Sequence, residues 1–217
     1  MSGVSPRRLA SGRVTRSAQA DRAAAAALVA RQRRSAPNGI WGMALFLCSE
    51  ITIFGTMISS YFYLESDNKH WPPAGIKPPS VTLPLIATGV LVLTIVPMFL
   101  ASRAARRGAR PAVLGFVSLA LVVQCAYLAV QILLFRHDLN QFRPQDTAYG
   151  SIYFTLLATH HAHVLLGILL DVVVLAYVAI RGLTNYWLTA VRNLAIYWYV
   201  VNVIAIVVVL TQLSPSL

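Results

Sequence analysis

The chain has 217 residues, of which 57% are apolar and 12% are charged. A soluble fold of this length has too little polar surface to cover so much apolar surface, and the charged share is about half the usual one. The composition excludes an ordinary cytoplasmic enzyme, a disulfide-stapled secreted domain and a disordered chain. It predicts an integral membrane protein.

Five apolar runs are long enough to cross a bilayer, which takes about 20 residues in a helix. In chain order they are expected to span residues 41–64, 81–100, 111–135, 150–180 and 193–213. The sequence therefore predicts an all-α fold, a five-helix integral membrane bundle formed by residues 38–217. Residues 1–37 carry eight arginines and are predicted to be a basic cytoplasmic arm, either flexible or a surface helix.

The net charge of +11 comes from 18 Lys and Arg against 7 Asp and Glu. Fourteen of the basic residues fall in the arm and in the loops on its side of the membrane, and four fall on the other side. The positive-inside rule then places the N-terminus in the cytoplasm and the C-terminus outside. Because the basic residues form no aromatic-lined groove, no nucleic-acid partner is expected.

Polar side chains within the apolar runs are the candidates for function, since an ionised carboxylate at mid-membrane costs about 2.5–3.5 kcal/mol on insertion scales. Counting residues from the helix ends places Glu50, Asp171 and Asn202 at a similar depth, which predicts one polar layer. Helical periodicity also puts His160, His163 and Asp171 on one face of the fourth run. Two interpretations stay open: a proton or lipid-headgroup site, or acids kept neutral by burial and hydrogen bonds.

Other polar residues favour structural roles. Gln124 and Gln131 lie seven residues apart in the third run and are expected to form hydrogen bonds between helices. No metal or haem site is predicted, because the intramembrane histidines all lie in one run and Cys48 and Cys125 belong to no ligand motif.

Four motifs follow one another along the chain at the predicted spans. They are WGMALFLCSEITIFGTMISSYFYL at 41–64, WPP at 71–73, AYGSIYFTLLATHHAHVLLG at 148–167 and AIYWYVVNV at 195–203. Their order, spacing and sidedness resemble subunit III of the haem–copper (cytochrome c) oxidases, in its short five-helix bacterial form. In this resemblance, Glu50, His160 and His163 fall on positions of the family's motifs, whereas Asp171 comes from helical periodicity alone.

The resemblance implies a non-catalytic subunit of a proton-pumping haem–copper terminal oxidase in a bacterial cytoplasmic membrane. Its implied partners are the catalytic subunit I, subunit II and phospholipids. The haem and copper are implied to lie in those partner subunits, and this chain is expected to hold no cofactor. Its implied tasks are to pack on the catalytic subunit, bind lipid and support proton uptake.

The closing motif departs from the family's usual His-Phe-x-Asp pattern. Tyr199 stands in place of the histidine and is expected to make a polar contact between helices, and Asn202 stands in place of the aspartate. These departures leave open an accessory subunit of a nitric oxide reductase. A further alternative is an independent proton-coupled transporter that uses Glu50 and Asp171.

Overall fold

The computed structural model of the chain describes residues 38–76, 82–182 and 184–216. The predicted arm, residues 1–37, lies outside the described residues. The chain divides into two units, residues 1–41 and 42–217. In the first unit, the described residues 38–41 are the first residues of a helix, and the second unit holds the bundle that follows.

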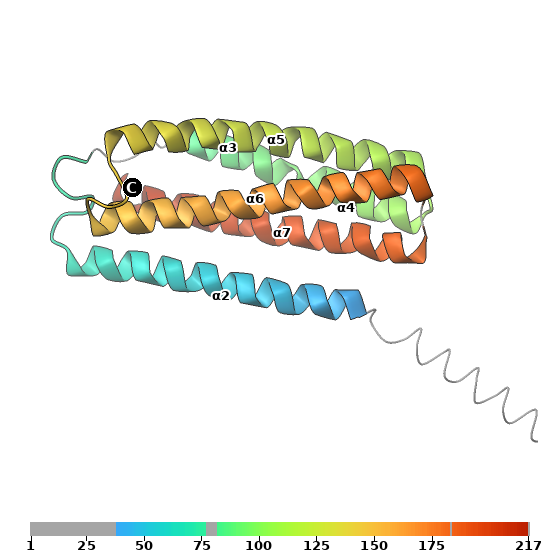
Figure 1. Cartoon of the computed structure of the whole chain (residues 1–217), viewed down its shortest axis with the longest axis horizontal. Helices are drawn as coiled ribbons and strands as arrows, with labels where there is room; N and C mark the ends of the chain where they lie inside the picture. Colours follow the sequence, from blue (N-terminus) through green and yellow to red (C-terminus); the bar gives the residue numbers. More distant parts are fainter. Residues whose placement is uncertain (1–37, 77–81, 183, 217) are drawn as a thin grey trace, which may run out of the picture. The chain divides into compact units, whose positions relative to one another are not determined.

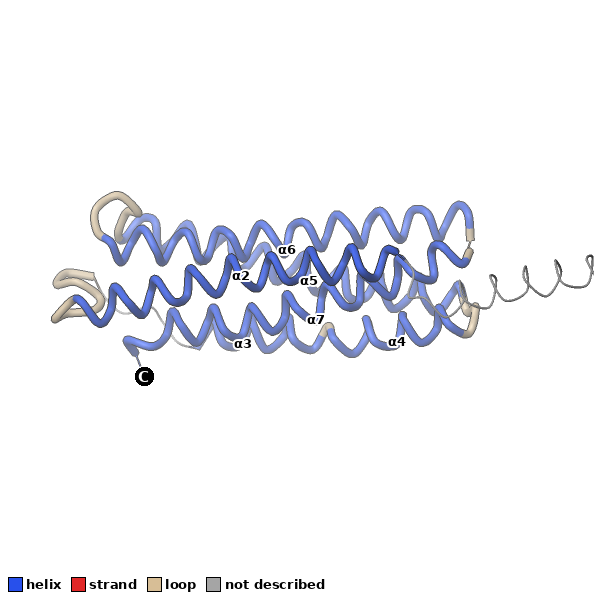
Figure 2. The backbone as a smooth tube through the Cα atoms, turned by 90° about the horizontal axis from the view of Figure 1, so that it is seen from below, coloured by secondary structure: helices blue, strands red, loops and turns tan. Residues whose placement is uncertain are grey.

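Most of the described residues are helical, and none of them lies in a strand. The elements are α2 (Asn38–Asp67), α3 (Thr82–Leu93), α4 (Ile95–Arg106), α5 (Arg110–Gln141), α6 (Ala148–Arg181), α7 (Asn185–Leu213) and a short 3₁₀ turn, η1 (Ser214–Ser216). Five spans in them are long and apolar enough to cross a membrane, with α3 and α4 together forming the second. Within residues 42–217 the helices run side by side along the long axis (Figures 1 and 2). The predicted all-α fold with five spans is confirmed.

The second span contains a break that its hydropathy does not show. Pro97 has no N–H to donate to the carbonyl of Leu93, and a proline ring clashes with that carbonyl in a regular helix. The helix accordingly stops at Leu93 and resumes at Ile95. Thr94, between the two helices, is 2% exposed, and both its N–H and its hydroxyl donate to the Leu91 carbonyl, at 3.0 and 2.6 Å.

The helices are longer than the predicted apolar runs, most clearly at three ends. α4 continues to Arg106 instead of ending at 100, α5 continues to Gln141 instead of ending at 135, and α7 begins at Asn185 instead of 193. Hydropathy marks the residues that face lipid, whereas backbone hydrogen bonding continues through polar residues at the ends of a span. At the start of α6, the Thr147 hydroxyl accepts a hydrogen bond from the N–H of Gly150 at 3.0 Å, which fixes that boundary.

The burial of the spans differs strongly. In the most apolar stretch of α7, 56% of the residues are buried, against 17% in the corresponding stretch of α2. α7 is thus the central helix, packed on α3, α4 and α6, and α2 lies at the edge of the bundle (Figure 1). A polar contact between α2 and another helix is therefore important for holding α2 in position, because few of its side chains are buried.

Candidate functional site

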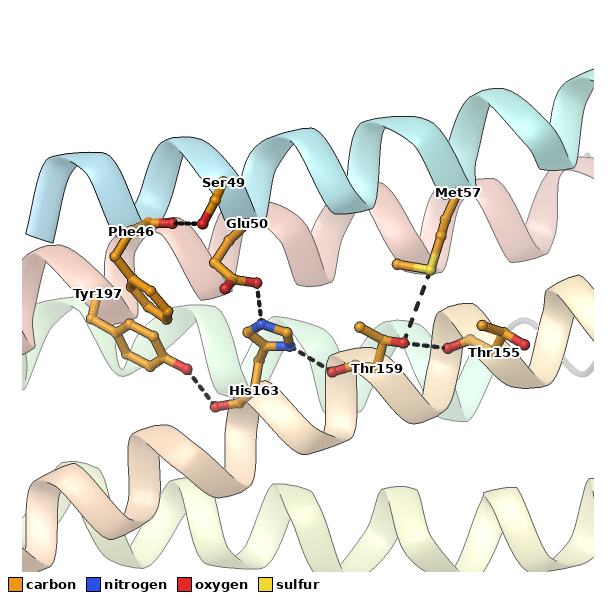
Figure 3. Close-up of polar contacts among 8 residues, drawn as sticks. All are labelled: Phe46, Ser49, Glu50, Met57, Thr155, Thr159, His163 and Tyr197. Carbon is orange, nitrogen blue, oxygen red and sulfur yellow. Dashed lines mark hydrogen bonds and ion pairs between the residues drawn. The ribbon is translucent and has the colours of Figure 1, made fainter.

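A polar contact joins α2 to α6 inside the membrane-spanning region. Glu50 Oε2 lies 2.5 Å from His163 Nε2, and the two side chains are 12% and 15% exposed (Figure 3). His163 Nδ1 lies 2.7 Å from the carbonyl oxygen of Thr159. A carbonyl oxygen only accepts, so Nδ1 must carry a hydrogen.

The position of that hydrogen limits the states of the pair. With Nδ1 protonated, Nε2 either accepts the proton of a neutral Glu50 carboxyl group or, in an imidazolium, donates to the carboxylate. Both forms hold one proton between the same two atoms. In either state, one hydrogen bond therefore connects α2 to α6 at this point.

Aromatic side chains surround this pair and bring in α7. The Phe54 ring meets the His163 ring edge-on at 5.2 Å. The Tyr197 hydroxyl donates to the His163 carbonyl at 2.7 Å (Figure 3). The Phe46 ring stacks on Tyr197 at 6.3 Å. The pair consequently lies where α2, α6 and α7 meet.

His160 points to another helix. It is 1% exposed, and its Nε2 lies 3.1 Å from the hydroxyl of Tyr127 on α5. The amide of Gln131 donates to the same hydroxyl at 3.0 Å. Gln131 therefore supports a contact between helices through Tyr127, one turn earlier on its own helix, and not by the direct bond that was predicted.

Asp171 binds α7. Its Oδ2 accepts a hydrogen bond from Trp198 Nε1 at 3.0 Å, and both side chains are fully buried. Gly167 makes room for the indole ring, because a Cβ at this position would lie 2.6 Å from Trp198 Cζ2. Among the described residues, Asp171 Oδ1 has no hydrogen-bond partner.

The prediction of one polar layer is wrong. His163, His160 and Asp171 contact α2, α5 and α7 respectively. His160 and His163 point about 60° apart around α6 and so reach different neighbours, whereas Asp171 points nearly the same way as His160 but lies eleven residues further along the helix, where another helix is close. Glu50 is level with His163, which precedes Asp171 by about 12 Å along the helix. Glu50 and Asp171 therefore do not share a depth.

Three further predicted residues form no hydrogen bond within the described part of the chain. Gln124 and Asn202 are fully buried, and none of their side-chain nitrogen and oxygen atoms has a partner there. The hydrogen bond between helices predicted for Gln124 is thus absent from the described residues, and Asn202 is not joined to the other polar residues. Tyr199 lines an apolar groove instead of making the expected polar contact.

The aromatic side chains that bind α6 were not among the predicted site residues. Tyr127, Tyr197 and Trp198 each direct a polar atom to α6, and all three are buried. A Tyr or Trp in an apolar run could have signalled this, since its O–H or N–H needs a partner when buried. That signal gives the need for a partner but not the partner's identity.

We expect Tyr127→Phe to lower the free energy of unfolding by about 1–3 kcal/mol, because Gln131 and His160 would each lose a buried partner. Thermal unfolding of the purified protein in detergent would measure the loss. Tyr177→Phe is the control, because Tyr177 is exposed and stacks on Trp187 through its ring. Equal stability of both variants would contradict a role for the Tyr127 hydroxyl.

Two hollows accompany these contacts. A cavity of about 30 Å³ lies among α3, α5, α6 and α7 next to His160 and Tyr127. It is large enough to hold a buried water, and Asp138, which accepts a hydrogen bond from Tyr153 at 2.8 Å, lies in its wall. The second is an apolar groove of about 380 Å³ between α2 and α7, lined by residues that include Ile51, Phe54, Gly55, Tyr199, Val203 and Val207.

These features define a class: a helical multi-pass membrane protein in which the peripheral helix α2, the first described one, contacts α6 through an internal carboxylate–imidazole pair. Residues 20–213 match the sequence model of the family described as cytochrome c oxidase subunit III. The chain belongs to this family, and the predicted resemblance is confirmed. It is thus a subunit type found in oxidase complexes.

Several oxidase subunits are similar to this chain along most of their own length. The cytochrome bo(3) ubiquinol oxidase subunit 3 of Pseudomonas aeruginosa is 26% identical over 175 residues, which are 80% of this chain and 83% of the relative. The quinol oxidase subunit 3 of Bacillus subtilis is 28% identical over a stretch that covers 76% of this chain and 81% of the relative. The cytochrome c oxidase subunit 3 of the same organism is 25% identical, over 77% and 81%.

Proposed function

We propose that this chain is the non-catalytic subunit III of a proton-pumping haem–copper terminal oxidase in a bacterial cytoplasmic membrane. Its N-terminus faces the cytoplasm and it packs on the catalytic subunit I, beside subunit II. The haem and copper belong to those partners, and this chain holds no cofactor. The observation that carries the proposal is the match of residues 20–213 to the subunit III family.

The proposed contribution to proton uptake rests on the Glu50–His163 pair. The two atoms that hold the shared proton are 2.5 Å apart, and both side chains keep a small exposed fraction. A carboxyl group and an imidazole in such contact can take up a proton at one member and release it from the other. The pair is therefore suited to passing protons toward a catalytic neighbour.

The proposed lipid-binding element is the groove between α2 and α7. Its walls are aliphatic and aromatic, so its chemistry fits a phospholipid acyl chain and not a polar solute. Because α2 meets the other helices through few side chains, an acyl chain in the groove would also fill the space beside it.

The first test is isolation of the tagged chain from its native membrane in mild detergent. A haem spectrum and a large multi-span partner are expected in the purified complex, together with reduction of O₂. A complex that reduces nitric oxide instead would support the nitric oxide reductase alternative. A chain that purifies without any haem-bearing partner would contradict the proposal.

Glu50→Gln is designed to test the proton role separately. The glutamine amide can still donate to His163 Nε2, so the contact between α2 and α6 is kept while the exchangeable carboxyl proton is removed. We expect slower proton uptake, or earlier inactivation during turnover, with normal assembly. Glu65→Gln, at the other end of α2, is the control, and equal behaviour of both variants would contradict the role of Glu50.

A further inference from the structure

The two ends of the described helices differ in charge. Figure 1 shows that α4 and α6 stop, and α5 and α7 start, at the same end of the bundle. The residues near these helix ends include six basic ones: Arg103, Arg106, Arg107, Arg110, Arg181 and Arg192. The described carboxylates lie either at the opposite end or, for Glu50 and Asp171, within the spans. The arginine-rich end therefore has no counter-ion among the described residues.

Three of these arginines line one surface pocket. Arg103, Arg106 and Arg107 surround a hollow of about 310 Å³ together with Phe99 and Ser102. None of the three forms an ion pair with a described carboxylate. The negative end of a helix dipole corresponds to about half a charge, so the end of α4 cannot balance three guanidinium groups.

The chemistry of the pocket favours a phosphate group. Guanidinium groups present flat pairs of N–H donors that match two oxygens of a phosphate. Arg110, just beyond the pocket, is engaged differently, since it donates to the backbone carbonyl of Ala179 on α6. The three pocket arginines thus form a separate cationic surface.

An apolar surface continues from the pocket along the same face of α4. Val96 and Phe99 precede Arg103 by seven and four residues, which places all three on one side of the helix. Val96 is 56% exposed and Phe99 is 53% exposed. A free anion would gain nothing from these side chains, whereas an acyl chain below a phosphate headgroup would cover them.

We propose that this face of α4 binds an anionic phospholipid, with the phosphodiester at Arg103, Arg106 and Arg107 and an acyl chain along Phe99 and Val96. The site is distinct from the groove between α2 and α7, which has no cationic lining. The proposal depends on membrane insertion and not on the proposed oxidase role, so the two can fail separately.

The test is native mass spectrometry of the protein as it purifies, complex included, titrated with phosphatidylglycerol or with phosphatidylcholine of the same acyl chains. Phosphatidylglycerol is expected to be retained and phosphatidylcholine to be lost. Each substitution Arg103→Gln, Arg106→Gln or Arg107→Gln should raise the dissociation constant about fivefold, and the triple variant about 100-fold. Arg181→Gln, which removes one charge at the same end outside the pocket, is the matched control and should change nothing.

Several results would overturn the proposal. Equal retention of the two lipids, or unchanged phosphatidylglycerol binding by the triple variant, would show that the pocket does not select the headgroup. Displacement of phosphatidylglycerol by inorganic phosphate at equal concentration would assign the pocket to a free anion. A carboxylate of a partner subunit bound to these arginines in the complex would assign it to a protein contact.

Discussion

Replacing Glu50 by leucine is expected to give the largest loss of stability. His163 Nε2 would lose its partner in a mostly buried position, and α2 would lose its contact at 2.5 Å with α6. An unsatisfied neutral group costs about 1–3 kcal/mol and a broken buried ion pair about 3–5 kcal/mol, so we expect about 3 kcal/mol. Thermal unfolding in detergent would measure it, and spin labels on α2 and α6 would report their separation.

Further variants separate the pair from its surroundings. His163→Leu should destabilise about as much as Glu50→Leu, and the double variant should lose clearly less than the sum, because neither partner is then left unsatisfied. Glu50→Gln should keep most of the stability, since an amide can still donate to the imidazole. A Glu50→Leu protein as stable as Glu65→Leu would show that the pair does not hold α2.

Gly167→Ala is expected to disturb the packing of α6 against α7. The added Cβ would lie 2.6 Å from Trp198 Cζ2 and 3.0 Å from two further ring atoms. The indole is fully buried and bound to Asp171 at 3.0 Å, so it cannot retreat without losing that bond. Overpacking of this kind costs about 1–3 kcal/mol, although alanine is normally better than glycine in a helix by about 1 kcal/mol.

The sign of the effect is the useful readout. Gly115→Ala on α5 is the matched control, because a Cβ there would meet nothing within 4 Å. It should be neutral or slightly stabilising, while Gly167→Ala should lower the unfolding temperature and change the fluorescence of Trp198. If both variants shift the unfolding temperature alike, the close packing of Gly167 against Trp198 does not make an added Cβ destabilising.

The sequence by itself determined the class of fold and most of the site candidates. Runs of about 20 apolar residues can only be helices in a bilayer, because each backbone polar group must be satisfied within its own segment. Glu50 and His163 stood out for a related reason, namely that ionisable groups inside such runs are costly. Hydropathy placed the ends of α5 and α7 less well, since helices continue past the lipid-facing residues.

Only the tertiary structure decided which neighbour each polar side chain meets. Periodicity gives the direction of a side chain about its own helix, but not the order of the helices around it. It therefore grouped His160, His163 and Asp171 on one face, although they bind α5, α2 and α7. Two other features likewise depend on how whole helices pack. They are the groove between α2 and α7 and the close contact of Trp198 with Gly167.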